Sequence, residues 1–179
     1  MTEAEWLACT DPQKMLESLQ AGGLLSERKR YRLDVALWDS EHETRSSIHT
    51  ARILEQREGA AMSRWAAGLG IVFAPDITAS IKKWGRARAV RLVRCVVGSP
   101  FRAASVESSW RTPTVLGLAQ NAYKEWTLPH NYLDTARLAV LADALEESGC
   151  DNVDILNHLR EPGPHARGCW AVDLLLGRR

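Results

Sequence analysis

The sequence has few of the residues on which several classes of protein depend. Its four cysteines in 179 residues are too sparse for a disulfide-bonded scaffold. Its 12 glycines and seven prolines are close to average abundance, which excludes a fibre or a flexible linker. The longest nearly apolar run, residues 66–74, is too short to span a bilayer, so we expect no membrane partner.

The chain also lacks an excess of charge of either sign. Its 23 Lys and Arg residues nearly balance 22 Asp and Glu residues, so no global field attracts nucleic acid or a membrane surface. The acidic start, residues 1–5, lacks the basic and apolar segments of a secretion signal. Together with the sparse cysteines, this start predicts a cytoplasmic location.

Apolar residues are abundant enough for a substantial core. They make up 45% of the chain, and a chain of this length buries roughly two thirds of its unfolded surface on folding. We therefore expect a single helical domain over residues 1–179, with residues 70–76 as the place where it could subdivide.

Most of the chain shows the spacing of apolar residues that is typical of helices. After an Asp134 cap, Leu138, Leu141 and Leu145 recur on one face and predict a buried helix. Similar patterns cover residues around 3–8, 12–21, 27–38, 48–69, 77–97, 113–123 and 153–159, with a strand as the alternative near residues 31–38. The last apolar segment, residues 168–176, fits a helix or a buried strand. The fold class predicted is all-α, a compact array of about seven to eight helices.

Several segments carry long, specific motifs. They are residues 1–12 (MTEAEWLACTDP), 98–102 (GSPFR), 141–145 (LADAL), 149–151 (GCD), 161–165 (EPGPH), 168–170 (GCW) and 173–177 (DLLLG). These segments resemble a group of paralogous helical proteins abundant in planctomycete-type bacteria. Residues 41–74 depart from the alanine-rich tract of that group, and Leu159 stands where the group often has a cysteine. The resemblance implies a helical bacterial protein and no particular activity.

The sequence contains no catalytic motif. A Gly-x-Ser-x-Gly elbow, a Walker A loop and a Gly-x-Gly-x-x-Gly loop are all absent from it. We therefore expect no catalytic residues and a protein that is not an enzyme.

The C-terminal quarter gathers residues of the types that bind zinc. Cys150, His158, His165 and Cys169 lie within 20 residues, and zinc takes four nitrogen or sulfur donors at tetrahedral angles. However, their spacing matches no known zinc finger. In the alternative that we favour, the cysteines fill the core, His165 hydrogen-bonds the Pro-Gly-Pro turn, and the protein has no cofactor.

One predicted helix is strongly basic. Residues 77–106 include seven basic residues and no acidic one, and the basic side chains fall mainly on one face. Such a face can neutralise phosphates in salt-dependent binding. Alternatively, it is solvated or pairs with the acidic stretch between Asp143 and Asp154. The candidate nucleic-acid-binding residues are Lys82, Lys83, Arg86, Arg91, Arg94 and Arg102.

The seven tryptophans are spread evenly rather than clustered with arginine, so we interpret most of them as core anchors. The leading functional hypothesis is a non-catalytic helical interaction module, or accessory subunit, that docks on a protein partner. The alternative is a nucleic-acid-binding accessory protein that uses the helix within residues 77–102. The third hypothesis is a zinc-binding module.

Overall fold

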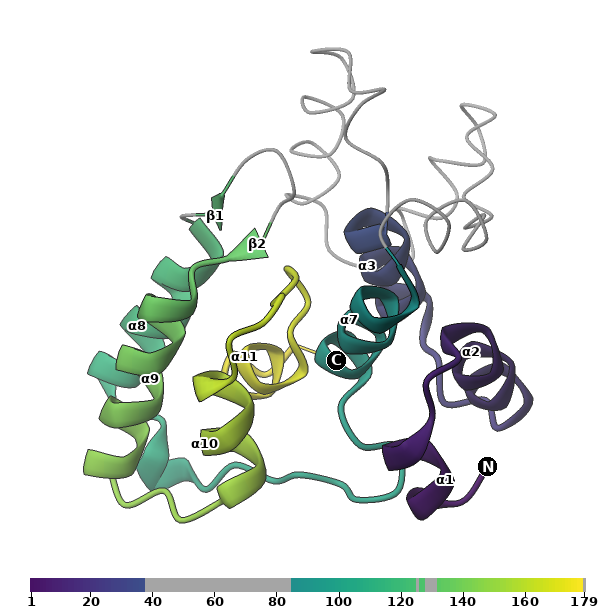
Figure 1. The fold of residues 1–179 in the computed structure, drawn as a ribbon. Coiled ribbons are helices and arrows are strands. Elements are labelled where there is room, and N and C mark those ends of the chain that lie inside the picture. The colour runs from purple at the N-terminus through teal and green to yellow at the C-terminus, as the bar shows by residue number, and fades with distance from the viewer. Residues whose placement is uncertain (38–84, 125, 128–131, 179) are drawn as a thin grey trace.

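The computed structural model describes residues 1–37, 85–124, 126–127 and 132–178 (Figure 1). Eight α-helices in these residues confirm the predicted all-α array. They are α1 (Glu3–Ala8), α2 (Pro12–Ala21), α3 (Glu27–Leu37), α7 (Arg86–Val97), α8 (Pro113–Lys124), α9 (Thr135–Glu147), α10 (Val153–Arg160) and α11 (Trp170–Leu175). The helix predicted over residues 48–69, the subdivision near residues 70–76 and residues 77–84 of the predicted basic helix lie outside the described residues. The sequence predicts one continuous basic helix over residues 77–97, but α7 begins only at Arg86, because Gly85 before it has a non-helical backbone with φ of +82°.

Three helices begin where the sequence predicts a cap. Thr2 and Glu5 form a capping box at α1, in which each side chain accepts a hydrogen bond from the other residue's backbone N–H. Asp11 caps α2, with Pro12 at its first position, and Asp134 caps α9. These three starts are therefore set by short-range signals, whereas α7 and α11 begin without a side-chain cap.

An N-terminal core forms where α2 and α3 pack against α7. Met15 and Leu19 of α2 belong to the same hydrophobic cluster as Leu92 and Val93 of α7. All four side chains are at most 2% exposed. Trp6 of α1 joins them at 2% exposure, as expected for a core anchor.

A C-terminal core forms between α8, α9 and α10. Leu138, Leu141 and Leu145 are fully buried there, which confirms the predicted apolar face of α9. Ile155 and Leu159 of α10 pack in the same cluster. In Figure 1, α8–α10 lie on one side of the molecule, α1–α3 and α7 on the other, and α11 lies between them.

A short antiparallel strand pair lies in the connection between α8 and α9, where helical patterning does not predict it. It joins β1 (Trp126–Thr127) to β2 (Tyr132–Leu133). Tyr132 also forms an isolated bridge with Ala166, and the Leu133 N–H donates to the His165 carbonyl at 2.8 Å. The strand pair thus fixes the backbone of residues 165–166.

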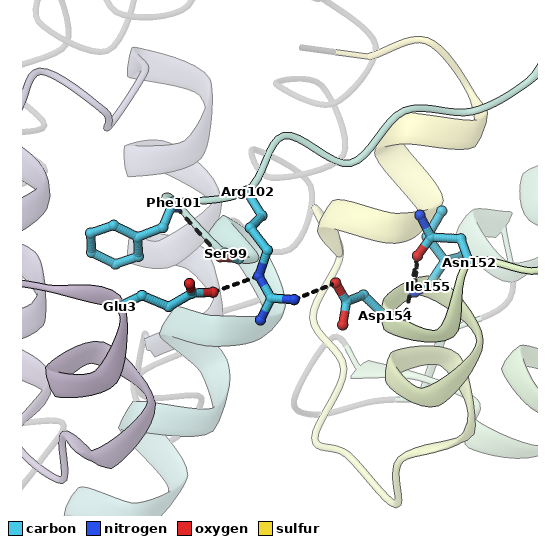
Figure 2. Close-up of polar contacts among 7 residues, drawn as sticks. All are labelled: Glu3, Ser99, Phe101, Arg102, Asn152, Asp154 and Ile155. Carbon is cyan, nitrogen blue, oxygen red and sulfur yellow. Dashed lines mark hydrogen bonds and ion pairs between the residues drawn. The ribbon is translucent and has the colours of Figure 1, made fainter.

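The chain crosses between the two cores after α7. Gly98 ends α7 with φ of +74°, and a Cβ at this position would lie 2.9 Å from the Trp170 ring. In the crossing segment, Arg102 forms ion pairs with Glu3 and with Asp154 (Figure 2). One exposed guanidinium thereby connects α1 with α10. In the part of the chain that is described, no helix is long and apolar enough to cross a membrane.

Candidate metal centre

Four potential zinc ligands meet between α7, α10 and the start of α11. Cys95, His158, His165 and Cys169 each place one donor atom within 4.8 Å of the others. The sequence pattern pointed to three of these residues, but it paired them with Cys150 rather than Cys95. The structure therefore assembles a Cys2His2 group from residues far apart in the chain.

Each ligand is held by a different local structure. Cys95 lies in the last turn of α7 and packs with the C-terminal core, whereas most of that helix packs with the N-terminal core. His158 lies on the buried side of α10, and Cys169 is the residue that immediately precedes α11. His165 is held through its carbonyl, which accepts the hydrogen bond from β2.

A polar network holds the connection between α10 and α11. The Gly168 N–H donates to the Tyr123 hydroxyl at 3.0 Å, and that hydroxyl donates to Asp173 at 2.6 Å. Asp173 also accepts two hydrogen bonds from Arg28, both at 2.9 Å. These contacts join the connection to α3, α8 and α11, so the position of Cys169 depends on three helices.

The donor distances suit tetrahedral zinc coordination. Cys95 Sγ lies 3.7 Å from His165 Nδ1, and Cys169 Sγ lies 3.3 Å from His158 Nε2. Zinc bonds of about 2.3 Å to sulfur and about 2.0–2.1 Å to nitrogen place adjacent ligands about 3.6 Å apart at the tetrahedral angle. These two sulfur–nitrogen distances are therefore close to the separation that a shared zinc ion requires.

The second nitrogen of each histidine ring faces Glu161. His165 Nε2 lies 3.0 Å from the Glu161 carbonyl oxygen, and His158 Nδ1 lies 3.6 Å from a carboxylate oxygen of the same residue. With its N–H directed at Glu161, each ring presents the lone pair of its other nitrogen to the cysteines. Acceptors of this kind orient zinc-bound histidines and increase their basicity. Glu161 thus provides an outer contact for both rings.

Burial and mutual contact change the protonation of the cluster. Burial raises the pKa of the Cys95 thiol well above its usual value, and a hydrogen bond to Cys169 raises it further. Burial also raises the pKa of Cys169, but hydrogen bonding by Cys95 and the contact with His158 outweigh it and hold that pKa well below its usual range. Burial lowers the pKa of His158, whereas Cys169 and Glu161 more than compensate and raise it to about 10. A zinc ion bound here would therefore displace a proton from Cys95 and one from His158.

Cys150 does not belong to the cluster, contrary to the set that the sequence suggested. It is 3% exposed and packs in the C-terminal core just before α10. Because α10 rises about 1.5 Å per residue, His158 is carried away from Cys150 toward the end of the helix. The sequence pattern did not indicate Cys95 as a ligand because this residue lies 70 positions before His165, within an apolar stretch of α7. Its identity as a cysteine was the one available signal.

The candidate nucleic-acid-binding residues fall into three groups. Lys82 and Lys83 lie outside the described residues, and Arg86 and Arg91 are exposed on α7. Arg94 is directed inward, where it donates to three backbone carbonyls at the end of α1 at 2.7–3.1 Å. Arg102 pairs with Glu3 and with Asp154, an acidic partner from the stretch that the sequence offered as the alternative.

The described residues define an all-α protein with a buried Cys2His2 group between two apolar cores. Comparisons of the chain with protein-family models, with curated proteins and with solved structures find no match. The resemblance to the planctomycete group therefore stays a prediction, and functional inference depends on the site itself.

Proposed function

We propose that the protein is a zinc-binding helical module in which a structural Cys2His2 centre joins α7 to α10 and α11. The observation that carries this proposal is the meeting of four donor atoms within 4.8 Å, with both outward ring nitrogens directed at Glu161. A set of two sulfur and two nitrogen donors favours zinc over cations that prefer oxygen ligands.

The ligand number favours a structural role over a catalytic one. Catalytic zinc sites have three protein ligands and leave the fourth position to water or substrate. Here four side chains of the chain supply the whole set, and Cys95, His165 and Cys169 are at most 1% exposed. A zinc ion in this position would cross-link segments up to 74 positions apart, from Cys95 to Cys169.

On this scaffold we infer a non-catalytic binding role, with docking on a protein partner as the leading form. The support is a pair of exposed apolar side chains on two neighbouring helices, Val140 of α9 at 52% and Val153 of α10 at 65%. For nucleic acid, the support is the exposed pair Arg86 and Arg91. A gel-shift titration against DNA and RNA at low salt separates the two roles, because a phosphate-binding face gives salt-dependent binding.

Metal analysis tests the zinc proposal directly. Protein purified without a metal-binding tag, under reducing conditions and without chelators, should contain about one zinc per chain by elemental mass spectrometry. Cys95→Ala and Cys169→Ala should each lose the zinc. Cys150→Ala, which truncates another buried cysteine outside the cluster, should retain it.

Two results would contradict the proposal. One is native protein without zinc that also fails to take up added zinc or cobalt. The other is a zinc content that falls in Cys150→Ala as much as in Cys95→Ala. A finer test is Glu161→Ala, which removes the carboxylate beside His158 and should weaken zinc binding by about 10–100-fold.

A further inference from the structure

A cleft of about 810 Å³ lies between α1, the end of α7, α10 and α11. Its walls include the apolar side chains of Trp6, Leu24 and Trp170 together with several charged groups. His158 forms part of one wall, so the cleft borders the metal centre. A volume in this range with a mixed lining is typical of sites for small organic molecules.

Each of the three acidic residues on the wall contacts an arginine or a histidine. The pairs are Asp154 with Arg102, Asp173 with Arg28, and Glu161 with His158. Figure 2 shows the first of these pairs, with Arg102 between Glu3 and Asp154. Two of these carboxylates, Asp154 and Asp173, are therefore already held in ion pairs with arginines of the protein.

Two basic residues on the same wall bind backbone carbonyls instead. Lys29 Nζ donates to the Val97 carbonyl at 3.1 Å, and Arg94 donates to the carbonyls at the end of α1. Among the residues that the structure describes, neither forms an ion pair with a carboxylate, and the buried Arg94 Nε has no hydrogen-bond partner. The nearby acids, Asp173 and Glu161, act on them at longer range and are already paired.

The Lys29 ammonium is the less well stabilised of the two cations. Burial lowers its pKa, and the attraction of Asp173 offsets this effect only in part. One of its three N–H groups donates a hydrogen bond to the Val97 carbonyl. An anion in the cleft would supply the counter-charge that this half-buried ammonium lacks.

We propose that the cleft binds a small organic anion, which has a carboxylate, phosphate or sulfonate group on an apolar body. The anionic group binds Lys29, with Arg94 adding positive potential, and the apolar body packs against Trp6 and Trp170. A charge-assisted hydrogen bond to a half-buried ammonium gives the site its preference for anions. The site does not depend on the zinc ion, since the anion meets the ammonium rather than the metal.

A matched pair of fluorescent probes tests this site in the full-length protein. Anilinonaphthalene sulfonate carries the anion, and phenylnaphthylamine has the same apolar body without it. The native protein should bind the sulfonate probe saturably at one site. Its affinity for the neutral probe should be lower by a factor of about ten or more. Zinc content measured on the same preparation shows separately whether the metal centre is intact.

Substitution of Lys29 removes the charge while keeping the side-chain length. Lys29→Met should lower the affinity for the sulfonate probe by about tenfold and leave the affinity for the neutral probe unchanged. Lys14→Met, at an exposed position of α2, is the control and should change neither. If Lys29→Met does not fold, Leu24→Glu introduces an acid at a side chain that is 48% exposed on the cleft wall and should weaken the sulfonate probe selectively.

Val140→Glu, at a similarly exposed apolar position of α9, is the control for Leu24→Glu. The proposal is overturned if native protein binds neither probe saturably, or if both probes bind with equal affinity. It is also overturned if the folded Lys29 and Leu24 variants bind the sulfonate probe as tightly as the native chain.

Discussion

The helix pair α9–α10 and the connection that follows it, residues 161–169, are held in place by different interactions. Apolar packing builds the helix pair, in which Leu141, Leu145, Ile155 and Leu159 are fully buried. The connection has no helix of its own and one isolated bridge, between Ala166 and Tyr132. Hydrogen bonds and the side chains of the Cys2His2 group hold it instead.

This difference determines how far each region depends on the rest of the chain. The contacts of α9 with α10 join residues close in sequence, and apolar packing has little directionality. The connection relies on Cys95 and Tyr123, which come from distant helices and must be placed accurately. Loss of one polar partner should therefore disorder the connection, whereas loss of apolar contact should weaken the whole domain.

Zinc removal should have the largest effect and should fall on the connection. The free energy of zinc binding in small zinc modules is about 10–16 kcal/mol, and it contributes to folding. Chelation should therefore lower the melting temperature by more than any single truncation of the core. Hydrogen exchange should show lost protection over residues 165–175, while α9 stays protected. Cys150→Ala with and without chelator is the control, and a uniform loss of protection across both regions would contradict the comparison.

Leu141→Ala should have the next largest effect, and it should fall on the helix pair. Because the side chain is fully buried, its truncation should lower the free energy of unfolding by about 2–5 kcal/mol in urea denaturation. The zinc content should stay at one per chain. Val140→Ala, on the exposed side of the same helix, should change stability by less than about 0.5 kcal/mol. Equal effects of the two substitutions would show that this face of α9 is not core.

Tyr123→Phe should have a smaller effect, confined to the connection. The substitution removes the acceptor of the Gly168 N–H and a donor to Asp173, and it should cost about 1–3 kcal/mol. Faster exchange of the Gly168 amide, with α9 unaffected, would be measured by nuclear magnetic resonance. An unchanged amide would mean that the hydroxyl does not position the connection.

Arg102→Gln should have the smallest effect. Its two ion pairs link α1 and α10, but the side chain is 57% exposed, and exposed pairs of this kind contribute little to stability. The melting temperature and zinc content should match those of the native chain within error. A clear loss of stability would show that the crossing segment, rather than the metal centre, joins the two cores.

Much of the helical architecture was predictable from short-range patterns. Asp134 and the leucines that follow it predict α9 because a cap and its apolar face involve residues only a few positions apart. The same proximity drew attention to His158, His165 and Cys169 as zinc ligands. The strand pair of β1 (Trp126–Thr127) with β2 (Tyr132–Leu133) was not predictable in this way, since it is very short and pairs through the backbone.

The sequence by itself determined the starts of α1, α2 and α9, the buried face of α9 and the supply of nitrogen and sulfur donors near the C-terminus. Only the tertiary structure decided that Cys95 rather than Cys150 completes the set, that Arg94 and Arg102 turn to partners within the protein, and that Lys29 faces a cleft. The physical reason is range. Capping and helical periodicity act over three or four residues, whereas ligand geometry and charge pairing depend on which helices cross, and the packing of both cores sets that crossing.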